Sequence, residues 1–186
     1  MSSTTQPSQL LLGFMTIFSE GNGYVGGYLV TNSWGRPLEF RLSTAVQPNK
    51  VQQILYANTL TEYLCADLIG KTLIDKTSTP VHILFSDSLL VLPVRSRLEI
   101  PVLGVVPKEG SDSGLPSDRD LISMTHRACS LTLCYESKWA ADLPVIQERL
   151  ERIDLGMDLS EPFLRIREAM GEARKMGVNR GTTQAA

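Results

Sequence analysis

The sequence has few of the residues that build metal sites, disulfide frameworks and catalytic centres. Its 186 residues include three cysteines and two histidines. Three cysteines at irregular spacing do not make a disulfide framework, so we expect free thiols at Cys65, Cys129 and Cys134 in a reducing, cytoplasmic setting. No coherent catalytic or metal-binding set stands out, which favours a non-enzymatic protein with no cofactor and no metal.

A strong net charge and long apolar runs are also missing. The formal net charge of −2 and the pI near 5.7 provide no global attraction to nucleic acid or to an anionic membrane. No stretch approaches the roughly 20 apolar residues of a membrane span. The run 10–18 is apolar, but no Lys or Arg precedes Arg36, so the positive flank of a secretory signal is absent. We expect neither nucleic acid nor a membrane as a partner.

The sequence does contain enough apolar material for a core, since 42% of its residues are hydrophobic. Its length fits one domain. We expect a disordered N-terminal tail over 1–9, a single domain over 10–177 and a disordered C-terminal tail over 178–186. A polar loop at about 108–120 is expected to be mobile.

Strand patterns dominate the first half of the chain. The run 10–18 is apolar on both faces, as in a central strand. Segments 26–32 and 38–43 predict a hairpin around the turn 32–37, in which Leu38, Phe40 and Leu42 form a buried face. The region 81–106 predicts a meander that includes a strand at 89–92, and 129–135 predicts another strand.

Helical patterns fill the middle and the end of the chain. A helical region starts near Asn49, and a capping box at 59–62 predicts a second start. Two C-terminal helices are expected to be capped by Asp142 and Ser160, and Gly177 is expected to end the second. Its apolar stripe contains Phe163, Ile166 and Met170, and the stripe near Asn49 contains Val51, Ile54 and Leu55.

The order of these elements predicts an α+β fold. We expect a largely antiparallel β-sheet of about five to seven strands, covered by the central helices and the two C-terminal helices. This order is similar to that of profilin-like, longin-like and PAS-like domains. The resemblance covers element order alone, since no motif of those families is present, and it implies nothing about function.

A glycine-rich run is the one segment that matches a phosphate-binding fingerprint. Gly21, Gly23, Gly26 and Gly27 contain the spacing Gly-x-Gly-x-x-Gly. A dinucleotide site needs a helix after the glycines, whereas Tyr28 begins what looks like a strand. Ligand binding by these glycines stays open beside the alternative, which is a flexible connection whose Gly26 and Gly27 allow close packing.

Two further groups have the composition of chemical sites. His126, Cys129 and Cys134 could contribute to a zinc or thiol site, but strand alternation places the two cysteines on opposite faces. The interpretation as buried free cysteines is favoured. Asp112, Asp118 and Asp120 lie in the polar loop, where a solvated loop is favoured over a cation site.

Function is therefore inferred from the surfaces that the pattern leaves exposed. Trp34 and Arg36 lie in the predicted turn, and Phe163 and Met170 lie on the terminal helix, where they pack on the sheet or dock on a partner. The first hypothesis is a non-enzymatic interaction or scaffold module that binds a protein partner or self-associates within a larger assembly. A PAS-like small-ligand sensor, with the glycine run or region 49–76 gating a pocket, is the alternative. A small hydrolase or metal enzyme using His126 and Cys129 is the second alternative.

Overall fold

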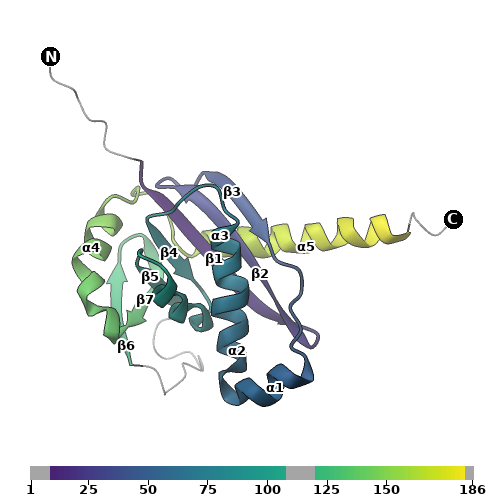
Figure 1. Cartoon of the computed structure of the whole chain (residues 1–186). Coiled ribbons are helices and arrows are strands. Elements are labelled where there is room, and N and C mark those ends of the chain that lie inside the picture. Colours follow the sequence, from purple (N-terminus) through teal and green to yellow (C-terminus); the bar gives the residue numbers. More distant parts are fainter. Residues whose placement is uncertain (1–8, 108–119, 183–186) are drawn as a thin grey trace.

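Seven strands form one mixed sheet in the computed structural model, which describes residues 9–107 and 120–182 (Figure 1). Their order across the sheet is β3-β2-β1-β4-β5-β7-β6. The strands are β1 (Leu11–Glu20), β2 (Gly23–Asn32), β3 (Pro37–Leu42), β4 (Ile83–Ser86), β5 (Val102–Val106), β6 (Leu121–His126) and β7 (Cys129–Glu136). With helices packed on this sheet, the fold is α+β, as predicted. Most of the expected N-terminal tail and of the expected mobile loop lies outside the described residues.

The sheet is largely antiparallel, with a parallel centre. Antiparallel pairs join β1 to β2, β2 to β3, β5 to β7 and β6 to β7. The central strand β1 is parallel to β4, and β4 is parallel to β5. A parallel pair needs a crossover between its strands. The short helix η3 (Leu89–Arg97) supplies that crossover between β4 and β5.

The strand predicted at 89–92 is therefore wrong. This segment is helical, and it buries Val91, Leu92 and Val94 on the sheet. A short apolar run has the same composition in a buried strand and in a buried helical turn, so periodicity could not distinguish them.

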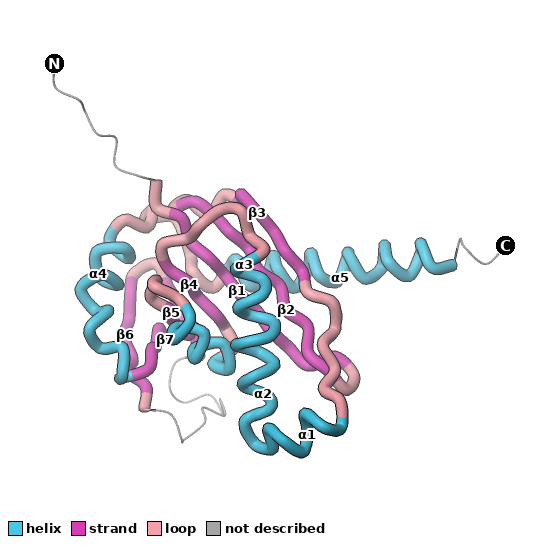
Figure 2. The backbone as a smooth tube through the Cα atoms, viewed as in Figure 1, coloured by secondary structure: helices cyan, strands magenta, loops and turns pink. Residues whose placement is uncertain are grey.

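Helical segments cover both faces of the sheet (Figure 2). On one face, η2 (Tyr63–Gly70), α3 (Lys71–Asp75) and η3 pack over side chains such as Met15 and Ile17. On the other face, α4 (Leu143–Glu151) and α5 (Glu161–Thr182) pack over side chains such as Leu12 and Phe14. Both faces of β1 are buried, as its apolar sequence predicts. Within the described ranges, no helix is long and apolar enough to cross a membrane.

The sequence predicted where the central helices begin, but it predicted only one of their two capping interactions correctly. Asn49 caps α1 (Lys50–Tyr56) with a complete capping box formed with Gln52. The start of α2 (Leu60–Glu62), after η1 (Ala57–Thr59), agrees with the prediction, but Thr59 makes no capping bond and donates instead to the Tyr56 carbonyl at 2.7 Å. The short segment η4 (Ser137–Asp142) precedes α4.

Two predicted helix signals were wrong. Asp142 precedes α4 without a capping bond, because both of its carboxylate oxygens accept hydrogen bonds from Arg95, at 2.7 and 3.0 Å. Helix α5 continues past Gly177 to Thr182, so this glycine does not end it.

The glycine run belongs mainly to a strand rather than to a flexible connection. Gly21 lies in the turn between β1 and β2 with φ +56°, and Gly23, Gly26 and Gly27 lie within β2. A Cβ atom on Gly26 would lie 2.5 Å from Ile69, and one on Gly27 would lie 2.5 Å from Ile166. These two glycines therefore let a helix pack closely on each face of β2, as the structural alternative for this run predicted.

Candidate protein interface at the edge of the sheet

The apolar face of β3 is exposed, whereas the sequence predicted that it would be buried. Leu38, Phe40 and Leu42 keep 45%, 37% and 39% of their surface exposed. Phe40 pairs with Leu29, which packs in the core beneath α5. Since Ile166 and Met170 of α5 lie against Gly27 of β2, the helix covers the sheet one strand short of its end. The prediction of a buried face was therefore wrong, because β3 lies beyond the helix that would cover it.

The outer side of β3 also presents unpaired backbone groups. Ser43 donates its N–H to the Gly26 carbonyl at 2.9 Å. In an antiparallel ladder, residue pairs that exchange such bonds alternate with pairs that do not. The register therefore turns the N–H and C=O groups of Phe40 and Leu42 away from β2. Within the described residues, no strand pairs with this side. We call Pro37–Leu42, with its exposed side chains and outward backbone groups, the β3 edge.

The opposite face of β3 carries an anchored ion pair. Arg41 contacts the Glu39 carboxylate at 2.7 Å, and the backbone N–H groups of Ser78 and Thr79 donate to the same carboxylate at 3.0 to 3.1 Å. Burial alone would raise the pKa of Glu39, but these hydrogen bonds outweigh it and lower the pKa to about 2. Glu39 therefore stays ionised at neutral pH and ties the end of the sheet to the segment that follows α3.

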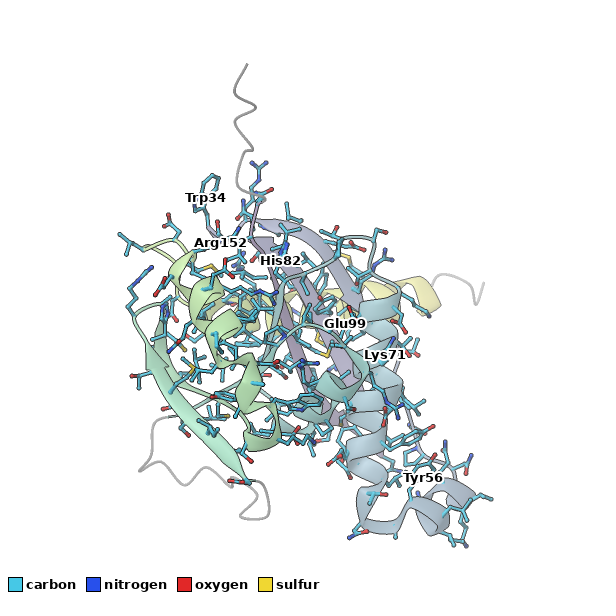
Figure 3. All side chains as sticks on the ribbon, turned by 60° about the vertical axis from the view of Figure 1, so that its left-hand side comes forward. Trp34, Tyr56, Lys71, His82, Glu99 and Arg152 are labelled. Atoms are coloured by element: carbon cyan, nitrogen blue, oxygen red, sulfur yellow. The ribbon has the colours of Figure 1, made fainter. Side chains whose placement is uncertain are left out.

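A fixed turn holds Trp34 at the beginning of the β3 edge. The Asn32 side chain accepts the N–H groups of Trp34 and Arg36 at 3.1 and 3.0 Å, and Gly35 has φ +78°. Arg165 of α5 donates to the Gly35 carbonyl at 2.8 Å. The turn is thereby bonded to the core, while the Trp34 side chain is 70% exposed and stands away from the body of the protein (Figure 3). A rigid turn with an exposed aromatic side chain is a favourable anchor for a partner.

Helix α1 lies beyond the other end of β3, and none of its residues is buried. Its predicted apolar stripe, Val51, Ile54 and Leu55, is 62% to 74% exposed. Tyr56 at its end stacks on Tyr63 with ring centres 4.2 Å apart. Trp34 and Tyr56 lie at opposite ends of the molecule, so the β3 edge runs between two exposed apolar groups (Figure 3).

Two shallow depressions flank the end of β3. One, of about 240 Å³, lies toward α5 and is lined in part by Val25, Leu42, Ala45 and Met170. The other, of about 360 Å³, lies between the segment after β3 and the helical segments on the other face of the sheet. Its lining includes Leu42, Thr44, Val46, Ile69, Leu73 and Lys76. The surface is therefore hollowed on both sides of the β3 edge.

The structure separates the partner-binding residues suggested by the sequence. Trp34 and Arg36 are exposed in the turn, whereas Phe163 and Met170 are buried between α5 and the sheet. Phe163 packs edge-on against Phe14 with ring centres 5.7 Å apart. Trp34 is therefore accessible from outside the protein, whereas Phe163 and Met170 would become accessible only if α5 left the sheet.

The thiols and imidazoles do not form a common site among the described residues. Cys65, Cys129 and Cys134 are buried thiols, and burial raises the pKa of Cys65 to about 12 and that of Cys134 to about 11. His126 accepts the Ala128 N–H at 3.2 Å, and His82 accepts the Leu11 N–H at 3.0 Å. No group of three His, Cys, Asp or Glu side chains in the described ranges could hold a metal ion. Asp112 and Asp118 lie outside those ranges, and Asp120 accepts a hydrogen bond from Ser137 at 2.6 Å.

A polar cluster that the sequence did not reveal lies at the end of β4. Asp87 pairs with Arg167 of α5, and Arg167 also donates to the Thr16 hydroxyl at 3.2 Å. Burial raises the pKa of the Asp87 carboxyl, and the contacts with Thr16 and Arg167 oppose this shift. From β1 the chain continues to β2 on one side, and from the neighbouring strand β4 it continues to β5 on the other side. Open sheets often bind ligands between two strands of this kind. Since Asp87 and Arg167 are paired with each other, we assign the cluster a structural role, which is to fix α5 on the sheet.

Comparison with known proteins adds no functional assignment. No protein-family model matches the chain, and no significant match to a curated protein was found. The similarity in element order to profilin-like, longin-like and PAS-like domains is therefore not confirmed. The case for function rests on the surface of the protein itself.

Proposed function

We propose that this protein is a non-enzymatic association module that acts as a subunit of a larger assembly, with the β3 edge as its docking surface. The observation that carries this proposal is the exposure of Leu38, Phe40 and Leu42 on a terminal strand with outward backbone groups. An exposed apolar edge strand is a template for another strand, and proteins that do not use one usually shield it.

The proposed mode of binding is strand addition. A partner strand would bond to the N–H and C=O groups of Phe40 and Leu42 and would cover the three apolar side chains. Trp34 would then act as an anchor at one end, because its turn is already ordered and little conformational entropy is lost on binding. Association would bury surface that the monomer leaves in water.

Leu42→Pro is the substitution that tests binding by strand addition. Because the N–H of Leu42 points outward, proline removes a bond to the partner without removing one to β2. The wild-type chain, tagged and isolated from the cells that make it, is expected in complexes heavier than the monomer. Leu42→Pro is expected to shift it to monomer mass, and Trp34→Ala is expected to weaken the association by about tenfold or more.

Leu164→Ala is the control, because Leu164 is an exposed apolar residue that belongs to α5 rather than to the β3 edge. Circular dichroism and thermal unfolding of all variants establish that they are folded. An unchanged complex mass and unchanged co-purifying proteins in Leu42→Pro and Trp34→Ala would refute the proposal.

We also propose small-ligand sensing as a second candidate, on the basis of the depression of about 360 Å³ beside Leu42 and Ile69. Its volume is at the lower end of the range for small-molecule sites, and part of it is formed by region 49–76. A ligand-induced rise in the melting temperature that is lost in Thr72→Trp, which fills the depression, would support it. No thermal shift across a ligand panel would count against it.

A further inference from the structure

We propose that the partner of the β3 edge is a second copy of this chain, paired antiparallel and centred on Phe40. This inference rests on the proposed function and specifies its partner. In such a dimer the two seven-stranded sheets become one continuous sheet. A two-fold symmetric pairing requires that the same strand be complementary to itself.

Backbone geometry restricts the possible registers. The outward N–H and C=O groups belong to Phe40 and Leu42, whereas Glu39 and Arg41 face β2 in the ladder. In a register centred between two residues, Phe40 of one copy would lie opposite Glu39 or Arg41 of the other copy. The N–H and C=O groups of those residues face β2 of their own copy, so they could not bond to Phe40. Only registers centred on a residue bring outward groups together.

Charge distinguishes the registers centred on the three residues Glu39, Phe40 and Arg41. A pairing centred on Glu39 sets the two Glu39 carboxylates opposite each other, and one centred on Arg41 sets two guanidinium groups opposite each other. A pairing centred on Phe40 sets Glu39 of each copy opposite Arg41 of the other. Opposite charges across an antiparallel pair are favourable and like charges are unfavourable. The strand is therefore complementary to itself in this register.

The same register satisfies the apolar face. It places Leu38 opposite Leu42 of the second copy, and Phe40 opposite its own equivalent. Phe40 and Leu42 lie in the regular part of the ladder, so they share one face of the joined sheet in both copies. Leu38 is the extra residue of β3 where the pairing with β2 shifts between Val30 and Thr31. The charged pairs fall on the opposite face, where Ser78 and Thr79 already hold Glu39 in position.

Cross-linking tests the central contact of this dimer. In a hydrogen-bonded antiparallel pair, the two Cα atoms at position 40 lie about 5.5 Å apart. Phe40→Cys is therefore expected to form a covalent dimer with a short bismaleimide, since the three native cysteines are buried. The control is Leu164→Cys, because Leu164 is exposed but belongs to α5 and not to the β3 edge. Equal cross-linking of both variants would contradict the pairing.

Substitutions that reverse the charge at positions 39 and 41 test the register independently, even if Phe40→Cys weakens the dimer. Arg41→Glu alone and Glu39→Arg alone are each expected to give monomers, because each sets like charges across the pair. An equimolar mixture of the two variants is expected to give a dimer with one chain of each, visible by native mass spectrometry, since both crossing pairs are then opposite in charge. Folding of each variant is checked by circular dichroism.

The outcomes separate this inference from the function on which it rests. A wild-type chain that sediments as a monomer at every concentration, or a mixture that forms no mixed dimer, overturns self-pairing. If the wild-type monomer still binds another protein and Leu42→Pro abolishes that binding, the docking function stands with a different partner. If a wild-type dimer forms and is unaffected by Leu42→Pro and Arg41→Glu, both proposals fail.

Discussion

At the scale of single residues, Glu39 determines how the end of the sheet is held. Its carboxylate accepts hydrogen bonds from the backbone of Ser78 and Thr79 and pairs with Arg41 on its own strand. Hydrogen bonds to an ionised group are stronger than those between neutral groups. One side chain thus joins β3 to the chain after α3 and keeps a fixed negative charge beside the exposed edge.

The first prediction concerns Glu39→Gln. Because the pKa of Glu39 is lowered to about 2, its stabilising contribution is fully present above its ordinary pKa and is lost as pH falls through about 2. We expect Glu39→Gln to lower the free energy of unfolding by about 1–2 kcal/mol at pH 7. The deficit should shrink as the pH is lowered from about 4.5 to about 2.

Denaturant unfolding at several pH values measures this deficit. Glu99→Gln serves as the control, because Glu99 is exposed and lies outside β3, whereas the Glu39 side chain is only 14% exposed. A deficit for Glu39→Gln that is the same at every pH would show that the carboxylate charge does not stabilise the edge.

The second prediction concerns the glycines of β2. A Cβ on Gly27 would lie 2.5 Å from Ile166 and 2.8 Å from Met170, so Gly27→Ala forces α5 away from the sheet. We expect a loss of about 1–3 kcal/mol in the free energy of unfolding. Gly171→Ala in α5 is the matched control, since nothing lies within 4 Å of its added methyl group and alanine favours helix. Equal stability of the two variants would refute the packing role of Gly27.

At the scale of elements, the sequence showed which helices and strands have an apolar face, but it did not show in every case whether that face is buried. The hairpin of β2 and β3, the buried strand β1 and the cap at Asn49 were all predicted from local patterns. The apolar faces of β3 and α1 were also recognised, but the prediction that β3 buries its face was wrong. Whether the apolar face of β3 is covered depends on how far α5 extends across the sheet. The local sequence pattern of β3 carries no information about that position.

Contacts between residues far apart in the sequence explain why the cap predicted at Asp142 was wrong and why the polar cluster at the end of β4 was not predicted. Asp142 does not cap α4 because Arg95, 47 positions earlier, takes its carboxylate. Arg167 likewise meets Thr16 and Asp87 from distant parts of the chain. Spacing rules describe neighbours within one helix or strand, so contacts of this kind follow only from the packed fold.

The third prediction concerns α1. Since Ile54 is 70% exposed, Ile54→Ser is expected to change the free energy of unfolding by less than about 0.5 kcal/mol. Ile166→Ala, at a fully buried position of α5, is expected to cost about 2–5 kcal/mol. Thermal and denaturant unfolding compare the two. A large loss for Ile54→Ser would mean that α1 packs against the protein in solution.

At the scale of the whole molecule, helical segments cover the two faces of the sheet unequally. Segments η2, α3 and η3 cover one face, and α4 and α5 cover the other, but β3 at one end keeps its apolar face in water. Trp34 and the stripe of α1 extend this exposed apolar surface beyond both ends of the strand. The asymmetry agrees with the function that we propose, in which a partner covers the apolar surface that the chain itself leaves open.

Amide hydrogen exchange at Phe40 and Leu42, followed against protein concentration, tests the central claim most directly. In the monomer both N–H groups point to solvent and should exchange rapidly. The proposed dimer predicts that their exchange slows as the concentration of the wild-type chain rises, and that it stays fast in Arg41→Glu. Rapid exchange of both amides at every concentration of the wild-type chain would contradict pairing at the β3 edge.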